Sequence, residues 1–176
     1  LTFSGLIGTE TLGQTVGSTF NNKNVGTGKT VTVNSITLAD GTNGGLAANY
    51  SISTGQTTTA NVTAKALTAT VSTTNKVYDS TTFANTILSL SGLIGSETLN
   101  VTANSTFDNK NIGSGKTVTV NSITLANGTN GGLAANYSIA TSQTTTATVT
   151  AKPLIVSGIT ASNKSYDTTT SVSLNT

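Results

Sequence analysis

The chain has 176 residues, of which 35% are hydrophobic and only 8% are charged, and its net charge is +2. Because it contains neither Cys nor His, thiol and imidazole chemistry, disulfide bonds and the commonest zinc ligands are excluded. The basic residues form no cluster, so we expect no nucleic-acid partner. No apolar run approaches the roughly 20 residues of a membrane-spanning helix, so we expect no membrane insertion.

The sequence repeats itself with an offset of 87 residues, which is the strongest feature of its organisation. Ser4–Gly8 recurs as Ser91–Gly95, and Gly44–Ile52 recurs as Gly131–Ile139. A third, partial copy begins near the end of the chain, where Asn163 and Lys164 repeat Asn75 and Lys76. Such self-similarity predicts tandem modules, and we expect the repeats to continue beyond both ends.

Alternation of apolar and polar residues predicts strands, taken here in chain order. In the segment 67–72, one face carries Leu67, Ala69 and Val71. In the segment 116–125, Val118 and Val120 share a face, whereas the apolar residues at 123 and 125 have the opposite parity. That slip predicts a bulge or a bend within the strand.

A further strand is predicted over 144–151, with Ala147, Val149 and Ala151 on one face and threonines on the other. Turn dipeptides at Asp40-Gly41 and Asn127-Gly128 separate the strands. No segment has a convincing helical period, and the nearest candidate, 95–99, is at most one turn.

The parity of the inward positions changes at Ala66 and again at Pro153, and we interpret both places as joints between repeats. The predicted domains are therefore the C-terminal part of a repeat (1–66), a complete repeat (67–153) and the N-terminal part of a third (154–176). These are called the first, second and third copies below. The alternative register, 1–87 and 88–176, stays open because the chain is about two periods long.

The expected fold class is all-β, with tandem Ig-like β-sandwich repeats forming a rod. β-Grasp-like modules and a β-solenoid are the alternatives. Because each repeat has few large apolar residues, we expect its aromatic residues to fill small cores. The residues expected to do so are Tyr78, Phe83, Phe107 and Tyr137.

Several motifs resemble YDG repeat domains over essentially the whole chain. They are Val77–Thr82 and Tyr166–Thr170, Phe107–Lys116 with its copy from Phe20, Ala135–Ile139, and Thr146–Lys152. The Gly of the signature is replaced by Ser80 and Thr168, so a turn that needs a positive φ would have to differ here. The resemblance implies a large exported bacterial protein, similar to filamentous-haemagglutinin-like adhesins of two-partner secretion. It implies no catalytic residues.

Candidate sites are few, and we predict no catalytic, cofactor-binding or metal-binding residues. The loop at Asp40 offers oxygen ligands, but its copy begins with Asn127, so we interpret both as plain hairpin loops rather than calcium sites. Glu97, Asp79 and Asp108 are the conceivable paired carboxylates. Lys110 or Lys116 with Glu97 is the conceivable set for an isopeptide bond. The carboxylate set is not repeated, because the first-copy counterpart of Asp108 is Asn21, and nothing in the spacing singles out the isopeptide set.

The expected function is that of structural stalk or spacer repeats in a large bacterial surface adhesin, supporting cell adhesion or biofilm formation. The protein is expected to be secreted to the cell surface and not to be an enzyme. Its expected partners are neighbouring repeats in the same chain. The alternative is a carbohydrate- or self-binding module acting through avidity, whose partners would be host glycans, matrix polysaccharide or other surface proteins.

Overall fold

The computed structural model describes residues 1–175, and these residues form β-strands joined by turns and loops. The only helical elements in this range are two single turns of 3-10 helix, η1 (Ala47–Asn49) and η2 (Ala134–Asn136). The prediction of an all-β fold is therefore confirmed. The strands are β1 (Leu12–Phe20), β2 (Gly26–Asp40), β3 (Thr57–Val62), β4 (Lys65–Thr73), β5 (Lys76–Val77), β6 (Phe83–Ala84), β7 (Thr86–Ser91), β8 (Leu99–Phe107), β9 (Gly113–Asn127), β10 (Tyr137–Ile139), β11 (Thr144–Thr150), β12 (Thr160–Ala161) and β13 (Leu174–Asn175).

The chain divides into two compact units, each built from three segments. The first unit comprises Leu1–Ala69, Ser89–Thr102 and Thr124–Ala140. The second comprises Thr70–Leu88, Ala103–Ile123 and Thr141–Thr176. Within the described residues, no helix is long and apolar enough to cross a bilayer.

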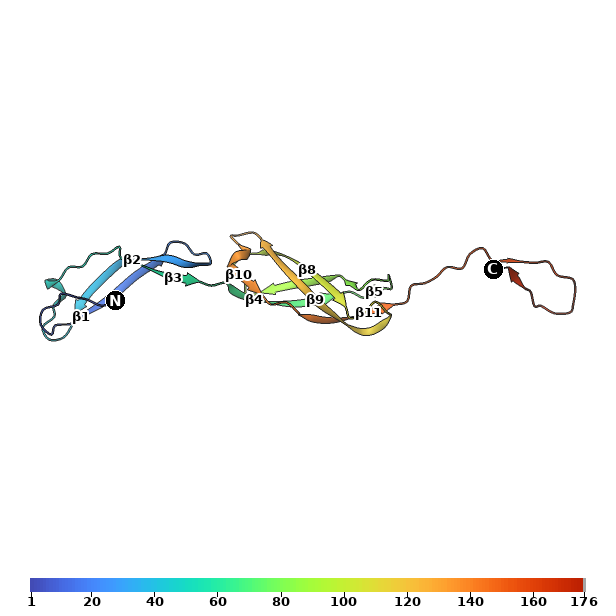
Figure 1. The fold of residues 1–176 in the computed structure, drawn as a ribbon, viewed down its shortest axis with the longest axis horizontal. Helices are drawn as coiled ribbons and strands as arrows, with labels where there is room; N and C mark the ends of the chain where they lie inside the picture. Colours follow the sequence, from blue (N-terminus) through green and yellow to red (C-terminus); the bar gives the residue numbers. More distant parts are fainter. Residues whose placement is uncertain (176) are drawn as a thin grey trace. The chain divides into compact units, whose positions relative to one another are not determined.

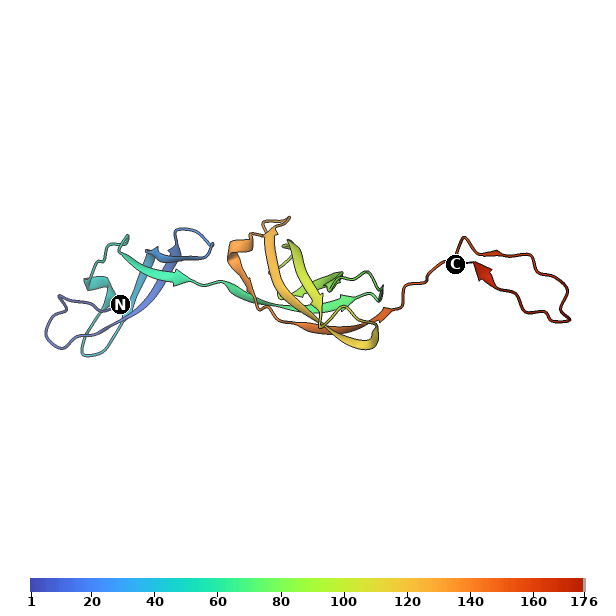
Figure 2. The same cartoon turned by 45° about the vertical axis from the view of Figure 1, so that its right-hand side comes forward.

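The first copy contributes an antiparallel sheet with the order β1-β2-β3 (Figures 1 and 2). Pairing of β1 with β2 passes from Gly17 opposite Ser35 to Ser18 opposite Val33, so that Asn34 is an extra residue in β2. Asn34 is the first-copy counterpart of Asn121, which lies between Val120 and Ile123. The predicted slip in parity is therefore confirmed as a β-bulge in the first copy.

The second copy contributes two open sheets, with the orders β10-β4-β7 and β5-β11-β9-β8-β6. β11 pairs antiparallel with β9 and parallel with β5, and β10 pairs parallel with β4. The predicted alternation is confirmed within β11, since Ala147 and Val149 are buried while Thr146 and Thr150 are exposed. It is wrong for Ala151, which lies beyond the end of β11 and is exposed. In β4 likewise Leu67 is buried and Thr68 is exposed.

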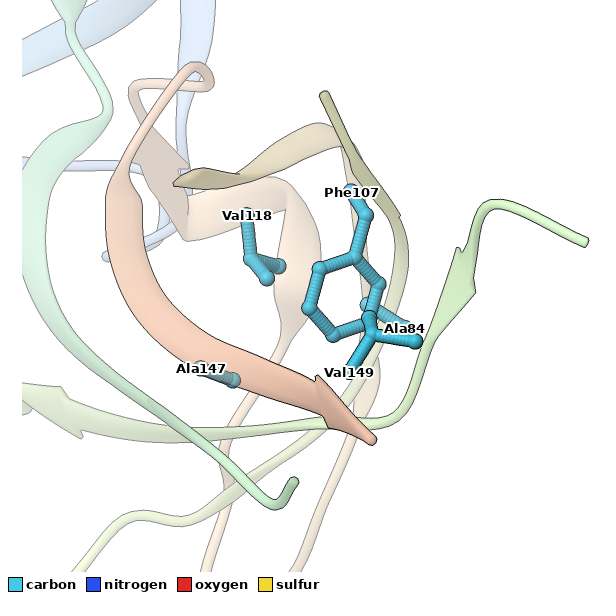
Figure 3. Packing of buried hydrophobic residues seen from close by; sticks show 5 residues of the cluster. All are labelled: Ala84, Phe107, Val118, Ala147 and Val149. Carbon is cyan, nitrogen blue, oxygen red and sulfur yellow. The ribbon is translucent and has the colours of Figure 1, made fainter. Parts of the chain in front are cut away.

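The core of the second unit is a small cluster that four strands supply (Figure 3). Phe107 of β8 is 3% exposed and fills the centre, against Val118 of β9 and Val149 of β11. Tyr78 packs against the edge of this cluster. Tyr137 is buried as well, at 7% exposed. The predicted core roles of Phe107, Tyr78 and Tyr137 are therefore confirmed.

The predicted core role of Phe83 is wrong, because this side chain is 60% exposed. Its neighbour Ala84 is 2% exposed and belongs to the core cluster. Successive residues of a strand point to opposite faces, so the inward place of Ala84 in β6 turns Phe83 outward. Figure 3 shows the methyl group of Ala84 beside Phe107 and Val149 in this cluster.

The predicted joint at Ala66 is not a break in backbone pairing. Ala66 lies within β4 and is opposite Ser138 of β10, whereas β3 ends at Val62 and β4 begins at Lys65. The strands are thus interrupted at 63–64, slightly before the predicted place. After β11 the described residues are exposed, and the short β12–β13 ladder closes a long loop there (Figure 2). The register of the three copies stays a prediction.

Gly132→Ala should destabilise the first unit by about 3 kcal/mol or more, at the upper end of the cost of overpacking. A β-carbon at this position would lie 1.9 Å from the carbonyl oxygen of Thr98, which is backbone and cannot rotate away. Gly113→Ala is the matched control, since its nearest neighbour is the flexible Lys116 side chain at 3.4 Å. Urea unfolding of both variants would test this, and equal stability losses would contradict the steric explanation.

Candidate functional site

A bonded trio of Tyr, Glu and Ile is present in both copies. In the second copy the Tyr137 hydroxyl donates a hydrogen bond to Glu97 Oε2 (2.5 Å) and accepts one from the Ile94 N–H (3.1 Å). In the first copy Tyr50 makes the same two bonds, to Glu10 and from the Ile7 N–H. Donation to the glutamate raises the pKa of both tyrosines, because ionisation would lose that hydrogen bond.

The trio of the second copy adjoins a loop of the first copy, Lys23 to Val25. Asn136, which precedes Tyr137, accepts a hydrogen bond from the Val25 N–H (2.9 Å) and donates one to Asn24 Oδ1 (3.1 Å). One amide side chain thus uses both its acceptor and its donor to bind the other copy. All of these residues belong to the first compact unit.

Charge is also complementary at this place. Lys23 Nζ lies 3.7 Å from Glu97 Oε1, and the lysine side chain is 76% exposed. The Glu97 side chain is only 14% exposed, but the solvated lysine is 3.7 Å away, so the pair contributes about 1 kcal/mol or less and acts mainly on the choice of partner. Val25, Lys65 and Ile94 line the same cleft. We call the contact of Lys23, Asn24 and Val25 with Ile94, Glu97 and Asn136 the junction.

In each copy a buried lysine holds the same loop, which in the first copy takes part in the junction. In the first copy Lys29 is 8% exposed and donates to Asn22 Oδ1 and to the Asn24 carbonyl oxygen. In the second copy Lys116 is equally buried and binds Asn109 Oδ1 at 2.7 Å and Asp108 Oδ1 at 2.8 Å. A buried ammonium group must find such acceptors, so each lysine orders its loop. Its ammonium beside the carboxylate also lowers the pKa of Asp108.

The Tyr-Asp turn is a second polar cluster. Asp79 Oδ1 accepts hydrogen bonds from the N–H and the hydroxyl of Thr81, and lies 2.8 Å from Lys76 Nζ. Ser80 has a φ of 66°, and its counterpart Thr168 has a φ of 57°. The expectation that the turn would differ without Gly is therefore wrong. The carboxylate and the lysine hold a non-glycine residue in the left-handed region, which it rarely adopts alone.

The stabilising effect of Asp79 should be lost in acid. The Lys76 ammonium and the Thr81 donors lower the pKa of Asp79 from 3.8 to about 2. A group whose pKa is lower in the folded state stabilises that state above its unfolded pKa, and the effect disappears as the pH falls through the folded pKa. Asp79→Asn should therefore be less stable than the parent chain above pH 3.8 and nearly equal to it near pH 2. Unfolding curves across this range would reveal it, and a stability gap that does not narrow would contradict the mechanism.

The loops considered for calcium use their side chains structurally. Asp40 Oδ1 accepts a hydrogen bond from the Ala47 N–H at 2.7 Å, and Asn127 Oδ1 does the same for Ala134 at 2.9 Å. Asp and Asn are interchangeable here because both supply the same acceptor oxygen. Among the described residues, no group of three or more potential ligands of the kind Asp, Glu, His or Cys is gathered in one place.

The structure does not bring together the three carboxylates considered for catalysis. Asp79 pairs with Lys76, Asp108 pairs with Lys116, and Glu97 binds Tyr137 and Lys23. Of the residues considered for an isopeptide bond, Lys116 binds Asn109 and Asp108, and Glu97 binds Tyr137 and Lys23.

Sequence reasoning missed the junction, although its residues occur in motifs that both copies carry. A Lys-Asn pair followed by an aliphatic residue stands at 23–25 and again at 110–112. Glu, Asn and Tyr stand at 10, 49 and 50, and again at 97, 136 and 137. Repetition of polar residues outside the strands was the available signal, but only the fold shows that one set faces the other.

Comparison with protein families gives one match, to the YDG domain, over residues 1–60 and 63–147. No curated protein and no solved structure matches the chain. The match covers both copies and includes the loop at Lys23, the Tyr-Asp turn and the Asn136–Tyr137 pair. The chain therefore belongs to the YDG domain family.

Proposed function

We propose that the chain supplies spacer repeats of a large bacterial surface adhesin, which support cell adhesion or biofilm formation. The observation that carries the proposal is the junction, where Asn136 of one copy binds the backbone N–H of Val25 and the side chain of Asn24 in another. The proposed localisation is secreted, at the cell surface. The proposed export route is two-partner secretion, as in filamentous-haemagglutinin-like proteins. The role requires no cofactor and is not enzymatic.

Contacts between neighbours are what a spacer needs. In a tandem array the stability is the sum of each repeat's own stability and the terms from contacts between adjacent repeats. Here the linking segment between β3 and β4 is only two residues long, and the polar contacts of Asn136 and Glu97 supplement the covalent link. Adjacent copies held in this way would resist independent rotation.

The finer architecture that we propose is a rod of tandem Ig-like β-sandwich repeats. Small-angle scattering of the chain should give a maximum dimension well above that of a globule of equal mass. Asn136→Ala should broaden the distance distribution, because neighbouring copies would reorient more freely. Asn49→Ala is the matched control, since it changes the same residue in the first copy, where the side chain is exposed. A compact globular profile for the parent chain would contradict the rod.

A glycan array separates the spacer from the alternative function, an adhesive module that binds carbohydrate through avidity. The spacer role predicts no saturable binding of the monomeric chain or of a multivalent display of it. The multivalent display is the more sensitive of these two measurements, because linked weak sites gain apparent affinity by orders of magnitude. Specific binding to one class of glycan that a free sugar competes away would overturn the spacer in favour of the adhesive module.

A further inference from the structure

Two pairs of parallel strands join the segment that enters the second copy to the segment that leaves it. β10 pairs parallel with β4, with Tyr137 opposite Lys65, and β11 pairs parallel with β5, with Thr150 opposite Val77 (Figure 1). β4 and β5 are the first strands of this copy in chain order, and β10 and β11 are its last. The parallel pairs therefore link the beginning of the copy to its end.

Tension along the chain must pass through these pairs. The first copy stands directly before β4, since β3 ends at Val62 and β4 begins at Lys65, and the third copy follows β11 from residue 154. A pull from both neighbours draws β4 and β5 back toward their N-terminal ends, and draws β10 and β11 forward toward their C-terminal ends. In each parallel pair the two forces act at opposite ends of the ladder, so its hydrogen bonds are loaded together, in shear. Strands pulled from the same end would separate one bond at a time.

We propose that the pairs β4–β10 and β5–β11 form a mechanical clamp, by which the second copy bears tension along the chain without unfolding. The direction of force that the clamp resists runs from the start of β4 to the end of β11. Load bearing of this kind goes beyond the spacer role, which requires only that adjacent copies stay in contact.

Hydrogen bonds cross the β5–β11 pair at both ends of β5. Directly after β5, the Tyr78 N–H donates to the Thr150 carbonyl oxygen (2.8 Å), and the Thr150 hydroxyl donates to the Lys76 carbonyl oxygen (3.4 Å). Directly before β5, Asn75 Oδ1 accepts a hydrogen bond from the Thr148 N–H (2.8 Å). The Asn75 side chain thus extends the ladder by one bond beyond a strand of only two residues.

The two short strands of the clamp, β5 and β10, are also fastened to the rest of the fold. In β5, Lys76 Nζ lies 2.8 Å from Asp79 Oδ1 and donates a hydrogen bond to the Phe83 carbonyl oxygen (2.9 Å). In β10, Tyr137 is buried and its hydroxyl binds Glu97. A strand anchored in this way cannot slide along its partner without breaking these bonds too. The Tyr-Asp turn thereby gains a mechanical role.

Apolar burial adds to the resistance of the clamp. Leu67 of β4, opposite Ile139, is 5% exposed, and Val149 of β11, opposite Lys76, is 2% exposed. Sliding of the strands would bring these side chains into water, which is unfavourable, while the hydrogen bonds break. Shear must therefore overcome both kinds of interaction in one step.

Pulling the same fold in two directions tests the clamp. The chain has no Cys, so a pair of introduced cysteines fixes both attachment points. Ala64→Cys with Lys152→Cys applies force just before β4 and just after β11, which is the shear direction. Ser80→Cys with Lys152→Cys applies force beyond the C-terminal ends of β5 and β11, which peels these two strands apart. All three positions are exposed, so the variants should fold.

Single-molecule force spectroscopy at one pulling speed should give a several-fold higher unfolding force in the shear direction than in the peeling direction. Forced unfolding is governed by the rate of unfolding rather than by equilibrium stability, so direction matters although the folded state is the same. Equal forces in the two directions would overturn the clamp and leave the junction and the spacer role untouched. Conversely, a compact scattering profile or specific glycan binding would overturn the spacer role without changing the forces.

Asn75→Ala should lower the unfolding force in the shear direction, because one of the bonds that share the load is removed. It should leave the peeling force unchanged, since peeling starts at the other end of β5. Asn163→Ala is the matched control, because Asn163 is the same residue in the third copy and lies outside both attachment points. A shear force that Asn75→Ala lowers no more than Asn163→Ala does would show that the Asn75 bond carries no load.

Discussion

Phe107→Ala should destabilise the second unit by about 3–5 kcal/mol, which is the usual cost of removing a buried aromatic side chain. Phe107 is 3% exposed and occupies the middle of the cluster with Val118 and Val149. Lys76 Nζ also lies 5.6 Å from the centre of the ring, and this favourable contact would be lost as well. Because small domains are stabilised by only about 5–15 kcal/mol, a large part of this unit's stability would be lost.

Phe20→Ala is the matched control, because Phe20 is the same residue in the first copy. Phe20 is 39% exposed, so its removal exposes less new surface to water and leaves a smaller cavity. Amide hydrogen exchange, followed for Val118 and for Val31, would report the two units separately. Equal losses of protection in the two variants would contradict the conclusion that the core of the second unit depends on Phe107.

Tyr137→Ala should lower the stability of the first unit by about 3–5 kcal/mol. The Tyr137 side chain is only 7% exposed, so the substitution removes a buried aromatic ring. Tyr137→Phe should cost less but still about 1–3 kcal/mol, since it leaves Glu97 and the Ile94 N–H without the hydroxyl. Unfolding curves of both variants would test this. A Phe variant as stable as the parent chain would show that the hydroxyl bonds contribute nothing.

Tyr50→Ala is the control for the tyrosine of the first copy, which makes the same hydroxyl bonds but is only half-buried. It should cost clearly less than Tyr137→Ala. The raised pKa of Tyr137 adds a dependence on pH: its stabilising effect is present below the ordinary value of 10.0 and is lost as the pH rises through the raised value. Tyr137→Phe should therefore approach the parent chain in stability at high pH. Loss of cell or glycan binding in a normally stable Tyr137→Ala chain would contradict both the packing role and the spacer.

Local patterns were enough to predict the strands of this protein. Alternation over 144–151 placed Ala147 and Val149 inward, and the structure buries both. The change of parity beyond Val120 predicted an irregularity, which appears in the first copy as the bulge at Asn34. Both predictions succeed because the period of two along a strand is a property of the backbone alone.

Short strands and tight turns were predicted less well. Phe83 lies in a strand of only two residues, which is too short to show an alternating pattern in the sequence. In the structure its side chain is exposed. Ser80 retains the left-handed turn because Asp79 and Lys76 hold it, and the sequence alone does not show that a lysine three residues earlier folds back to do so.

The sequence by itself therefore determined the all-β class, the repeated organisation and the faces of the long strands, because these follow from propensity and period. Tertiary structure alone decided where the repeated polar residues meet. Lys23 and Glu97 are separated by most of a repeat, and Asn24 and Asn136 by more than one. No local rule relates residues so far apart. Their contact depends on where β4 begins after β3 and on how β10 pairs with β4, which are properties of the folded backbone.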